Sequence, residues 1–223
     1  MALLKDSDKE TVRQRLTEMS RKVRMVFVTQ EMECQFCAQT HELLDEVSEL
    51  SDKLELVVLD LLSDHEQAAS YNLREVPGLN LVAVDEDGTE HNYGVLFYGI
   101  PAGYEFVSLL EGILLVSEGD SDLSDLSKAK LKAIDKPVEI QVFVTPTCPY
   151  CTTAVHMAHQ LAVACPHITG VMVEATEYPH LAIKYAVRGV PKSVFSEEIS
   201  VEGAVPEEAF VDAARRAGGL QLI

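Results

Sequence analysis

Apolar residues along the chain follow two spacings, one typical of strands and one typical of helices. Two β-rich runs, VRMVFVT (23–29) and VEIQVFVT (138–145), are each followed by a helical stretch and then by a further apolar run, LELVVLDLL (54–62) or ITGVMVEA (168–175). Continuous apolar runs of this length are typical of strands buried in a sheet that is covered on both faces. The pattern therefore predicts an α/β structure in which helices cover a sheet.

The remaining pattern places the same further elements after each pair of strands. An opening, a middle and a closing helix are expected at 7–21, 64–72 and 103–117 in the first half and at 124–134, 178–186 and 206–217 in the second. A strand pair precedes each closing helix and turns at 85–88 or at 196–198. Both halves therefore have the order αβαβαββα.

The two halves are copies of each other at a shift of 114 residues. The sequence CQFC (34–37) falls on CPYC (148–151), and YNLREVP (71–77) falls on YAVRGVP (185–191). An acidic, Ser-rich stretch near 117–127 has no apolar periodicity and separates the copies. We expect two units, residues 1–118 with the CQFC site and residues 119–223 with the CPYC site, which touch because their connection is short.

Net charge and apolar run length exclude several classes of partner. The chain has 36 acidic and 18 basic residues and a formal charge of -18, so it repels phosphate backbones and anionic lipid headgroups. It has neither an N-terminal apolar signal nor an uncharged apolar run of about 18 residues. We expect a cytoplasmic protein with no nucleic-acid or membrane partner, in a compartment where structural disulfides are rare.

The paired cysteines are suited to thiol–disulfide exchange. This chemistry needs a thiolate that attacks a disulfide and a second thiol, two residues on, that resolves the mixed disulfide. A helix N-terminus lowers the pKa of a nearby thiol, so Cys34 and Cys148 are the predicted nucleophiles. Cys37 and Cys151, one turn further into the helices, are the predicted resolving thiols.

A zinc site is the competing interpretation of two Cys-x-x-Cys pairs. Paired zinc knuckles usually lie about 15–20 residues apart, whereas these pairs are 114 apart, so redox chemistry is favoured and no metal is expected. The seven histidines show no spacing typical of metal ligands. Cys165 has no counterpart at the shift of 114 and is interpreted as a small buried residue.

The order strand, CxxC, helix, strand, helix, Val-Pro, hairpin, helix resembles thioredoxin-like proteins. The tandem CQFC and CPYC sites, with FVTPTCPYC (143–151), EYPHLAIKYAVRGVPK (177–192) and LFYGIPAGYEF (96–106), resemble the protein disulfide oxidoreductases of thermophilic archaea and bacteria. This resemblance implies two tandem thioredoxin-like folds, each a central mixed β-sheet flanked by helices. It covers essentially the whole chain.

The resemblance also implies a substrate-binding segment beside each cysteine pair. Pro77 and Pro191 are expected to be cis, although cis bonds are only about 5–6% of X-Pro bonds. The backbones of Val76 and Val190 would then pair with an extended segment of the substrate.

Two strand-end acids are candidate proton carriers. Asp60 and Glu174 end strands that are central in such a fold, and each is interpreted as a possible proton relay or as a surface acid. The acid that thioredoxins carry six positions before CxxC is replaced by Val28 and Val142. The loop TQEMEC before the first pair is interpreted as two residues longer than TPTC before the second, so the two sites are expected to differ in potential.

We therefore expect dithiol–disulfide exchange on protein substrates without a bound cofactor. The chain has no GxGxxG fingerprint, so electrons would come from an NADPH-dependent flavoprotein similar to thioredoxin reductase. One alternative is a dedicated electron relay to a peroxiredoxin-type peroxidase, because the N-terminal part of the alkyl hydroperoxide reductase flavoprotein is also a double thioredoxin fold. That family keeps only its second CxxC, whereas both are intact here. The other alternative is a non-catalytic zinc or binding module.

Overall fold

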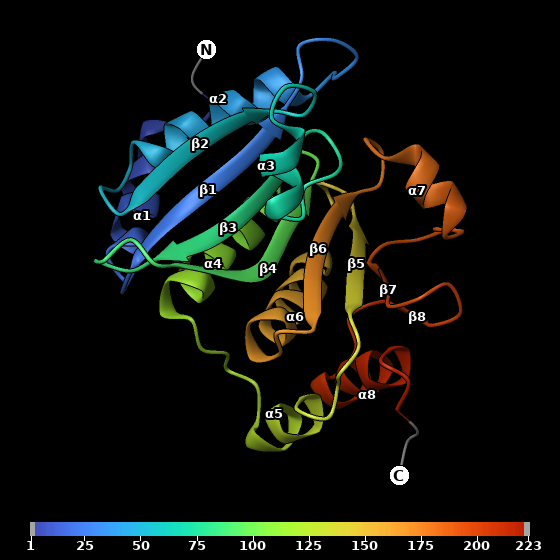
Figure 1. Cartoon of the computed structure of the whole chain (residues 1–223). Helices are drawn as coiled ribbons and strands as arrows, with labels where there is room; N and C mark the ends of the chain where they lie inside the picture. The colour runs from blue at the N-terminus through green and yellow to red at the C-terminus, as the bar shows by residue number, and fades with distance from the viewer. Residues whose placement is uncertain (1–2, 221–223) are drawn as a thin grey trace.

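Both halves of the chain contribute to one continuous sheet in the computed structural model, which describes residues 3–220 (Figure 1). The strands are β1 (Lys22–Thr29), β2 (Leu54–Asp60), β3 (Gly78–Val84), β4 (Glu90–Tyr98), β5 (Val138–Val144), β6 (Ile168–Glu174), β7 (Lys192–Val194) and β8 (Ser200–Glu202). The helices are α1 (Asp6–Leu16), α2 (Cys37–Ser48), α3 (His65–Ser70), α4 (Glu105–Glu118), α5 (Asp125–Leu131), α6 (Cys151–Ala164), α7 (Pro179–Lys184) and α8 (Glu207–Ala217).

The strand order shows the internal repeat directly. Across the sheet it runs β2-β1-β3-β4-β6-β5-β7-β8, so the second half of the sheet repeats the arrangement of the first. The junction is a parallel pairing of β4 with β6, which places Tyr98 opposite Val173. The predicted α/β class and tandem thioredoxin-like arrangement are confirmed, with the two sheets merged into one. The boundary between residues 118 and 119 stays a prediction.

Helices cover both faces of this sheet. In Figure 1, α2, α4 and α6 lie behind the sheet and α3 lies in front of it. Alternate residues of β6 contact different layers: Met172 belongs to the core on the α4 and α6 side, while Val171 and Val173 belong to the core beneath α3 and α7. Apolar side chains on both faces of the central strands are therefore withdrawn from water.

The two predicted buried strands differ in exposure. Strand β6 is buried along most of its length because it has β4 and β5 as neighbours. Strand β2 has the same apolar pattern but is an edge strand, and Val58 is 40% exposed. The prediction that 54–62 is covered on both faces and central was wrong, since the first unit has no neighbouring unit beside β2.

All strands that lead into a cysteine pair end at one edge of the sheet. Strands β1 and β2 are parallel, as are β5 and β6, and β4 is parallel to β6 and, through β3, to β1. Their carboxyl ends form the upper edge in Figure 1, here called the carboxyl edge. Both CxxC loops therefore lie at the same edge.

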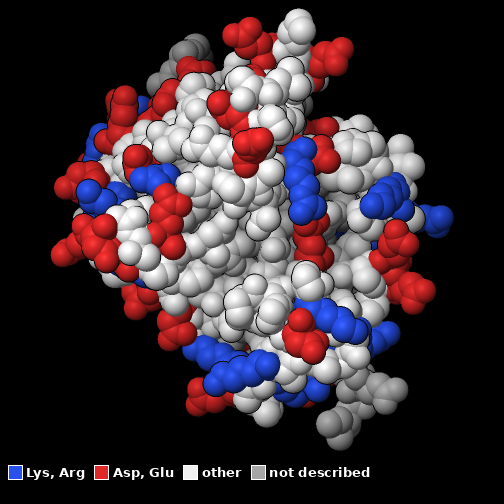
Figure 2. All heavy atoms as spheres, in the orientation of Figure 1, with Lys and Arg blue, Asp and Glu red and all other residues white. Residues whose placement is uncertain are grey.

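Acidic side chains are spread over the face seen in Figure 2, with Lys and Arg interspersed among them. No helix within residues 3–220 is long and apolar enough to span a bilayer.

Candidate active site

Both CxxC pairs form disulfides at the starts of helices that leave the carboxyl edge. Cys34 is bonded to Cys37 and Cys148 to Cys151, with 5.5 Å between the Cα atoms in each pair. The helices α2 and α6 begin at the second cysteine of each pair, so the first cysteines lie in the loops before them. The prediction that the second cysteines lie one turn inside the helices was therefore wrong. The apolar intervening residues are not part of the helices.

Exposure differs within each pair in the sense that exchange chemistry requires. Cys37 is 3% exposed and Cys151 is fully buried, whereas Cys148 is 8% exposed and Cys34 is only partly buried. Tyr150, between the second pair, is 70% exposed. The outer cysteine of each pair is thus the one that a partner protein reaches first.

A cis proline lies beside each pair. The Val76–Pro77 and Val190–Pro191 bonds are both cis, which confirms this expectation. The strands that follow them, β3 and β7, pair with β1 and β5 next to the loops that carry the cysteines. The backbone NH of Gly99 donates to the Pro77 carbonyl at 2.9 Å, which anchors the first of these segments.

Strand pairing corrects the length of the first cysteine loop. Thr29 pairs with Asp60 and Val144 pairs with Glu174, so Thr29 and Val144 occupy equivalent positions in the two units. The loop before the first pair is then 30–33 and that before the second is 145–147, a difference of one residue and not two. Alignment on the cysteines alone had carried the insertion into the strand.

The same register decides where a thioredoxin-type acid would stand. Val142 belongs to the core that contains Cys151, whereas Val28 faces the opposite core. Phe27, not Val28, is on the face equivalent to that of Val142. Both equivalent positions are apolar, so another group must carry protons near the sulfurs.

Asp60 is occupied by the turn that follows β2. Its Oδ1 accepts hydrogen bonds from the backbone NH groups of Ser63 (2.9 Å) and Leu62 (3.0 Å) and from the Ser63 hydroxyl. The Ser63 backbone bond is the main cause that lowers the pKa of Asp60 below its ordinary value. The structure therefore favours the surface alternative for Asp60.

Glu174 is buried at the end of the central strand β6 and is 2% exposed. Its Oε2 accepts hydrogen bonds from the Thr176 hydroxyl (2.6 Å) and the Glu177 backbone NH (2.7 Å). Its Oε1 is buried and has no hydrogen-bond partner among the described residues. By strand alternation Glu174 is on the face of Met172, whose core includes Cys151.

Glu177 is a second buried acid at this position, and nothing in the sequence pattern singled it out. Its Oε1 accepts a hydrogen bond of 2.8 Å from the backbone NH of Ile100, in the first unit. Burial, together with the charge of Glu174, raises the pKa of Glu177 to about 7. The pair Glu174 and Glu177 is therefore able to hold and release a proton near neutral pH.

Glu105 is a third buried acid that the sequence pattern did not indicate. It is the first residue of α4, is 1% exposed and accepts a hydrogen bond of 2.6 Å from the Ser108 hydroxyl. Burial raises its pKa to about 7. The preceding residue, Tyr104, donates its backbone NH to the carbonyl of Pro146, two residues before Cys148. The start of α4 thus contacts the loop of the second site.

Residues 3–220 contain no group of three or more His, Cys, Asp or Glu side chains arranged to hold a metal ion.

The arrangement of the whole chain matches that of a protein of known structure. A protein disulfide oxidoreductase from Aeropyrum pernix K1 superposes with a TM-score of 0.87 and 30% identity, over 98% of this chain and 96% of that one. The chain belongs to the protein disulfide oxidoreductase family. A thioredoxin domain model matches residues 138–214 of this oxidoreductase, which lie in its second unit.

More distant relatives share part of the sequence or the fold. The F component of alkyl hydroperoxide reductase (AhpF) from Staphylococcus epidermidis is 28% identical to this oxidoreductase over 137 residues, which are 61% of this chain and 24% of the relative. The chain thus spans about a quarter of the length of the curated relatives it matches. The structure of AhpF from Enterococcus faecalis, at 22% identity and a TM-score of 0.84, covers 95% of this chain and has the same fold.

Proposed function

We propose that the protein is a thiol–disulfide oxidoreductase that reduces, forms or isomerises disulfides in protein substrates at its two CxxC sites. The observation that carries this proposal is the repeated arrangement at the carboxyl edge. There, each unit has a cysteine pair with an outer and a buried sulfur beside a cis proline.

The cysteines divide the reaction into two exchanges. In the reducing direction, the thiolate of Cys34 or Cys148 attacks one sulfur of a substrate disulfide, and the other substrate sulfur leaves as a thiolate. The thiol of Cys37 or Cys151 loses its proton and attacks the mixed disulfide. The second substrate thiolate leaves, and the enzyme is left with a disulfide, having given two electrons to the substrate. The reverse sequence forms a substrate disulfide.

The segments before β3 and β7 are proposed to bind the substrate. An extended chain beside Val76 or Val190 would pair with their backbone as a short strand and place its disulfide against the outer sulfur. The carbonyl of each following proline is already bound, by Gly99 NH at Pro77 and by Gly203 NH at Pro191, at 2.9 and 2.8 Å. This pairing fixes the segments without using the valine backbone.

Proton transfer at the second site is assigned to Glu174. Its buried Oε1 is free to accept a hydrogen bond, and its position on the face of the Cys151 core supports a role in removing the resolving proton. Asp60, whose carboxylate holds a turn, is not proposed for this role.

The electron partner is proposed to be an NADPH-dependent flavoprotein similar to thioredoxin reductase. The similarity to AhpF supports a second candidate, in which the protein passes electrons to a peroxiredoxin-type peroxidase. Activity on insulin without a peroxidase supports the general oxidoreductase, and activity only with a peroxiredoxin supports the relay.

The test is dithiothreitol-dependent reduction of insulin, followed as turbidity, with zinc measured on the same preparation. Cys148→Ser is expected to remove most of the activity and Cys34→Ser to leave a substantial fraction, because CPYC is the commoner redox sequence. Cys165→Ser is the matched control, a buried cysteine outside both pairs, and should keep full activity. The opposite ranking contradicts the assignment of the dominant site. An inactive, zinc-loaded wild type overturns the proposal.

A further inference from the structure

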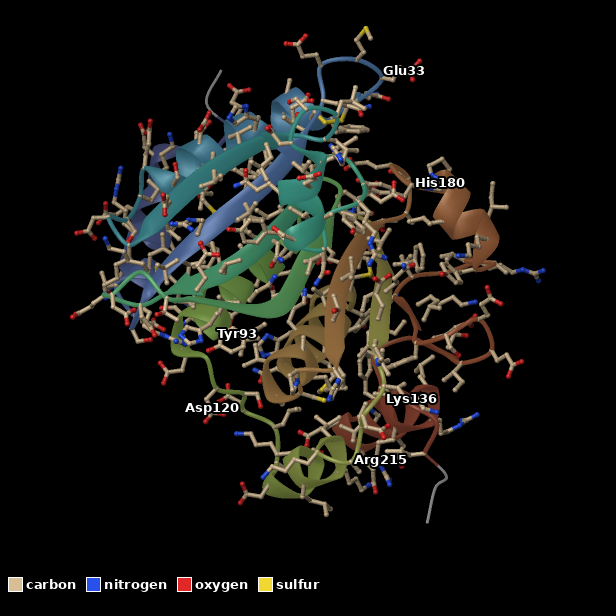
Figure 3. All side chains as sticks on the ribbon, viewed as in Figure 1. Glu33, Tyr93, Asp120, Lys136, His180 and Arg215 are labelled. Carbon is tan, nitrogen blue, oxygen red and sulfur yellow. A yellow bond between two sulfur atoms is a disulfide. The ribbon has the colours of Figure 1, made fainter. Side chains whose placement is uncertain are left out.

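The loop that follows β6, residues 174–180, belongs to the second unit but contacts the substrate-binding segment of the first. We call it the junction loop. The Tyr178 hydroxyl donates a hydrogen bond of 2.9 Å to the carbonyl of Pro77. The His180 Nε2 lies 3.9 Å from a carboxylate oxygen of Glu75, just before the cis bond. Figure 3 shows His180 where this loop enters α7 and Glu33 in the first cysteine loop, both at the carboxyl edge.

Tyr178 is built into the core and held in one orientation. It is 3% exposed, and its ring lies 5.9 Å from that of Tyr98, between centroids. Burial raises the pKa of the Tyr178 hydroxyl above its ordinary value, so the hydroxyl stays protonated and donates. The Pro77 carbonyl thus accepts two hydrogen bonds, from Tyr178 and from Gly99 NH.

The second site has no equivalent of this contact. Within residues 3–220 the Pro191 carbonyl accepts only the Gly203 NH. At the shift of 114, Tyr178 corresponds to Asp64, whose carboxylate accepts the Asp60 NH of its own unit at 2.8 Å. The asymmetry has a simple origin, because the second unit packs on the first along β4 and no further unit packs on β8.

We propose that Tyr178 is a positioning residue of the first site, which the second unit thereby completes. This inference rests on the proposed function, since it assigns substrate pairing to the backbone of Val76. By fixing the Pro77 carbonyl, the hydroxyl fixes the peptide that joins Pro77 to the strand and so restricts the valine before it. A binding segment that is already ordered loses less entropy when a substrate pairs with it.

The test compares Tyr178→Phe in two backgrounds, each with one working site. Cys148→Ser with Cys151→Ser leaves the first site, and Cys34→Ser with Cys37→Ser leaves the second. Tyr98→Phe is the matched control: Tyr98 is 5% exposed, packs against Tyr178 and donates its hydroxyl to the Asn72 carbonyl, not to Pro77, at 3.1 Å. Both variants lose one buried hydroxyl and keep the ring.

At the first site, Tyr178→Phe is expected to raise the KM for a disulfide-containing peptide roughly three- to tenfold, the range of one net hydrogen bond, with little change in kcat. The second site and both Tyr98→Phe proteins should keep their KM. Equal KM values for Tyr178→Phe and Tyr98→Phe at the first site overturn the inference. A first-site protein that is inactive even with Tyr178 contradicts the proposed function of that site instead.

Hydrogen exchange of residues 75–79 gives a readout that needs no turnover. Tyr178→Phe should speed exchange in this segment and Tyr98→Phe should not. Unchanged exchange in Tyr178→Phe overturns the inference whether or not the first site is active.

Discussion

The carboxylate of Glu177 in the second unit accepts a hydrogen bond of 2.8 Å from the backbone NH of Ile100 in the first. This bond lies at the end of the β4–β6 pairing, where Tyr98 is opposite Val173. The last strand of the first unit is therefore an interior strand of the whole sheet. Each unit repeats a complete set of elements, yet neither has a finished surface without the other.

We expect residues 1–119 alone to be much less stable than the full chain. Removing the second unit uncovers the paired edge of β4 and the buried residues Val95, Leu96 and Phe97. An unprotected, apolar edge strand promotes self-association. Thermal unfolding and size-exclusion chromatography would show a lower midpoint and oligomers. A monomeric fragment with the midpoint of the full chain would mean that the units are independent.

We expect Gly99→Ala to destabilise the protein more than the same change at its repeat counterpart, Gly203. Both glycines have positive φ, +95° and +80°, so alanine costs roughly 1 kcal/mol or more at either position. At Gly99 an added Cβ would also lie 2.6 Å from the Glu174 Cβ, whereas nothing lies within 4 Å at Gly203. Overpacking adds about 1–3 kcal/mol. Urea unfolding of the two variants measures the difference, and equal losses would contradict the close approach of the two units.

We expect Glu105→Gln to stabilise the protein at neutral and alkaline pH. Burial raises the pKa of Glu105 from 4.5 to about 7, so the folded state holds a proton that the unfolded state has released. Stability from this group is fully present below about pH 4.5 and is lost as the pH rises through about 7. The loss is on the order of 2–3 kcal/mol.

The measurement is urea unfolding between pH 4.5 and 8. The variant should lose less stability than the wild type as the pH rises, and the two should be similar at the acid end. Glu118→Gln, an exposed position at the end of the same helix, is the control and should follow the wild type. A pH dependence unchanged in Glu105→Gln would mean that Glu105 does not titrate in this range.

We expect alkylation of the reduced protein to distinguish the five cysteines. Cys34 and Cys148 are the outer thiols of their pairs, whereas Cys37 and Cys151 are more deeply buried. Burial also raises the pKa of the free Cys165, which reduces its thiolate fraction. A short pulse of iodoacetamide followed by peptide mass spectrometry should modify the outer thiols first. Earlier modification of either inner thiol would exchange the assigned roles.

The sequence by itself determined the elements, their order and the chemistry of the cysteines. Apolar periodicity, the Asp-Gly turn and the spacing from CxxC to Val-Pro are local properties, so each is visible without knowledge of distant contacts. Because the pattern occurs twice, each copy supported the interpretation of the other. The cis state of Pro77 and Pro191 followed from family resemblance and not from local physics.

Tertiary structure decided what depends on neighbours far away in the chain. Runs 54–62 and 168–175 have similar apolar patterns, but only the second has strands on both sides, so burial could not be read from composition. Strand pairing, not distance from the cysteines, set the one-residue difference between the loops. Glu177 and Tyr178 acquire their partners from the first unit, about 77 and 101 residues away. Such contacts arise when long-range pairing closes the sheet, and no local pattern encodes them.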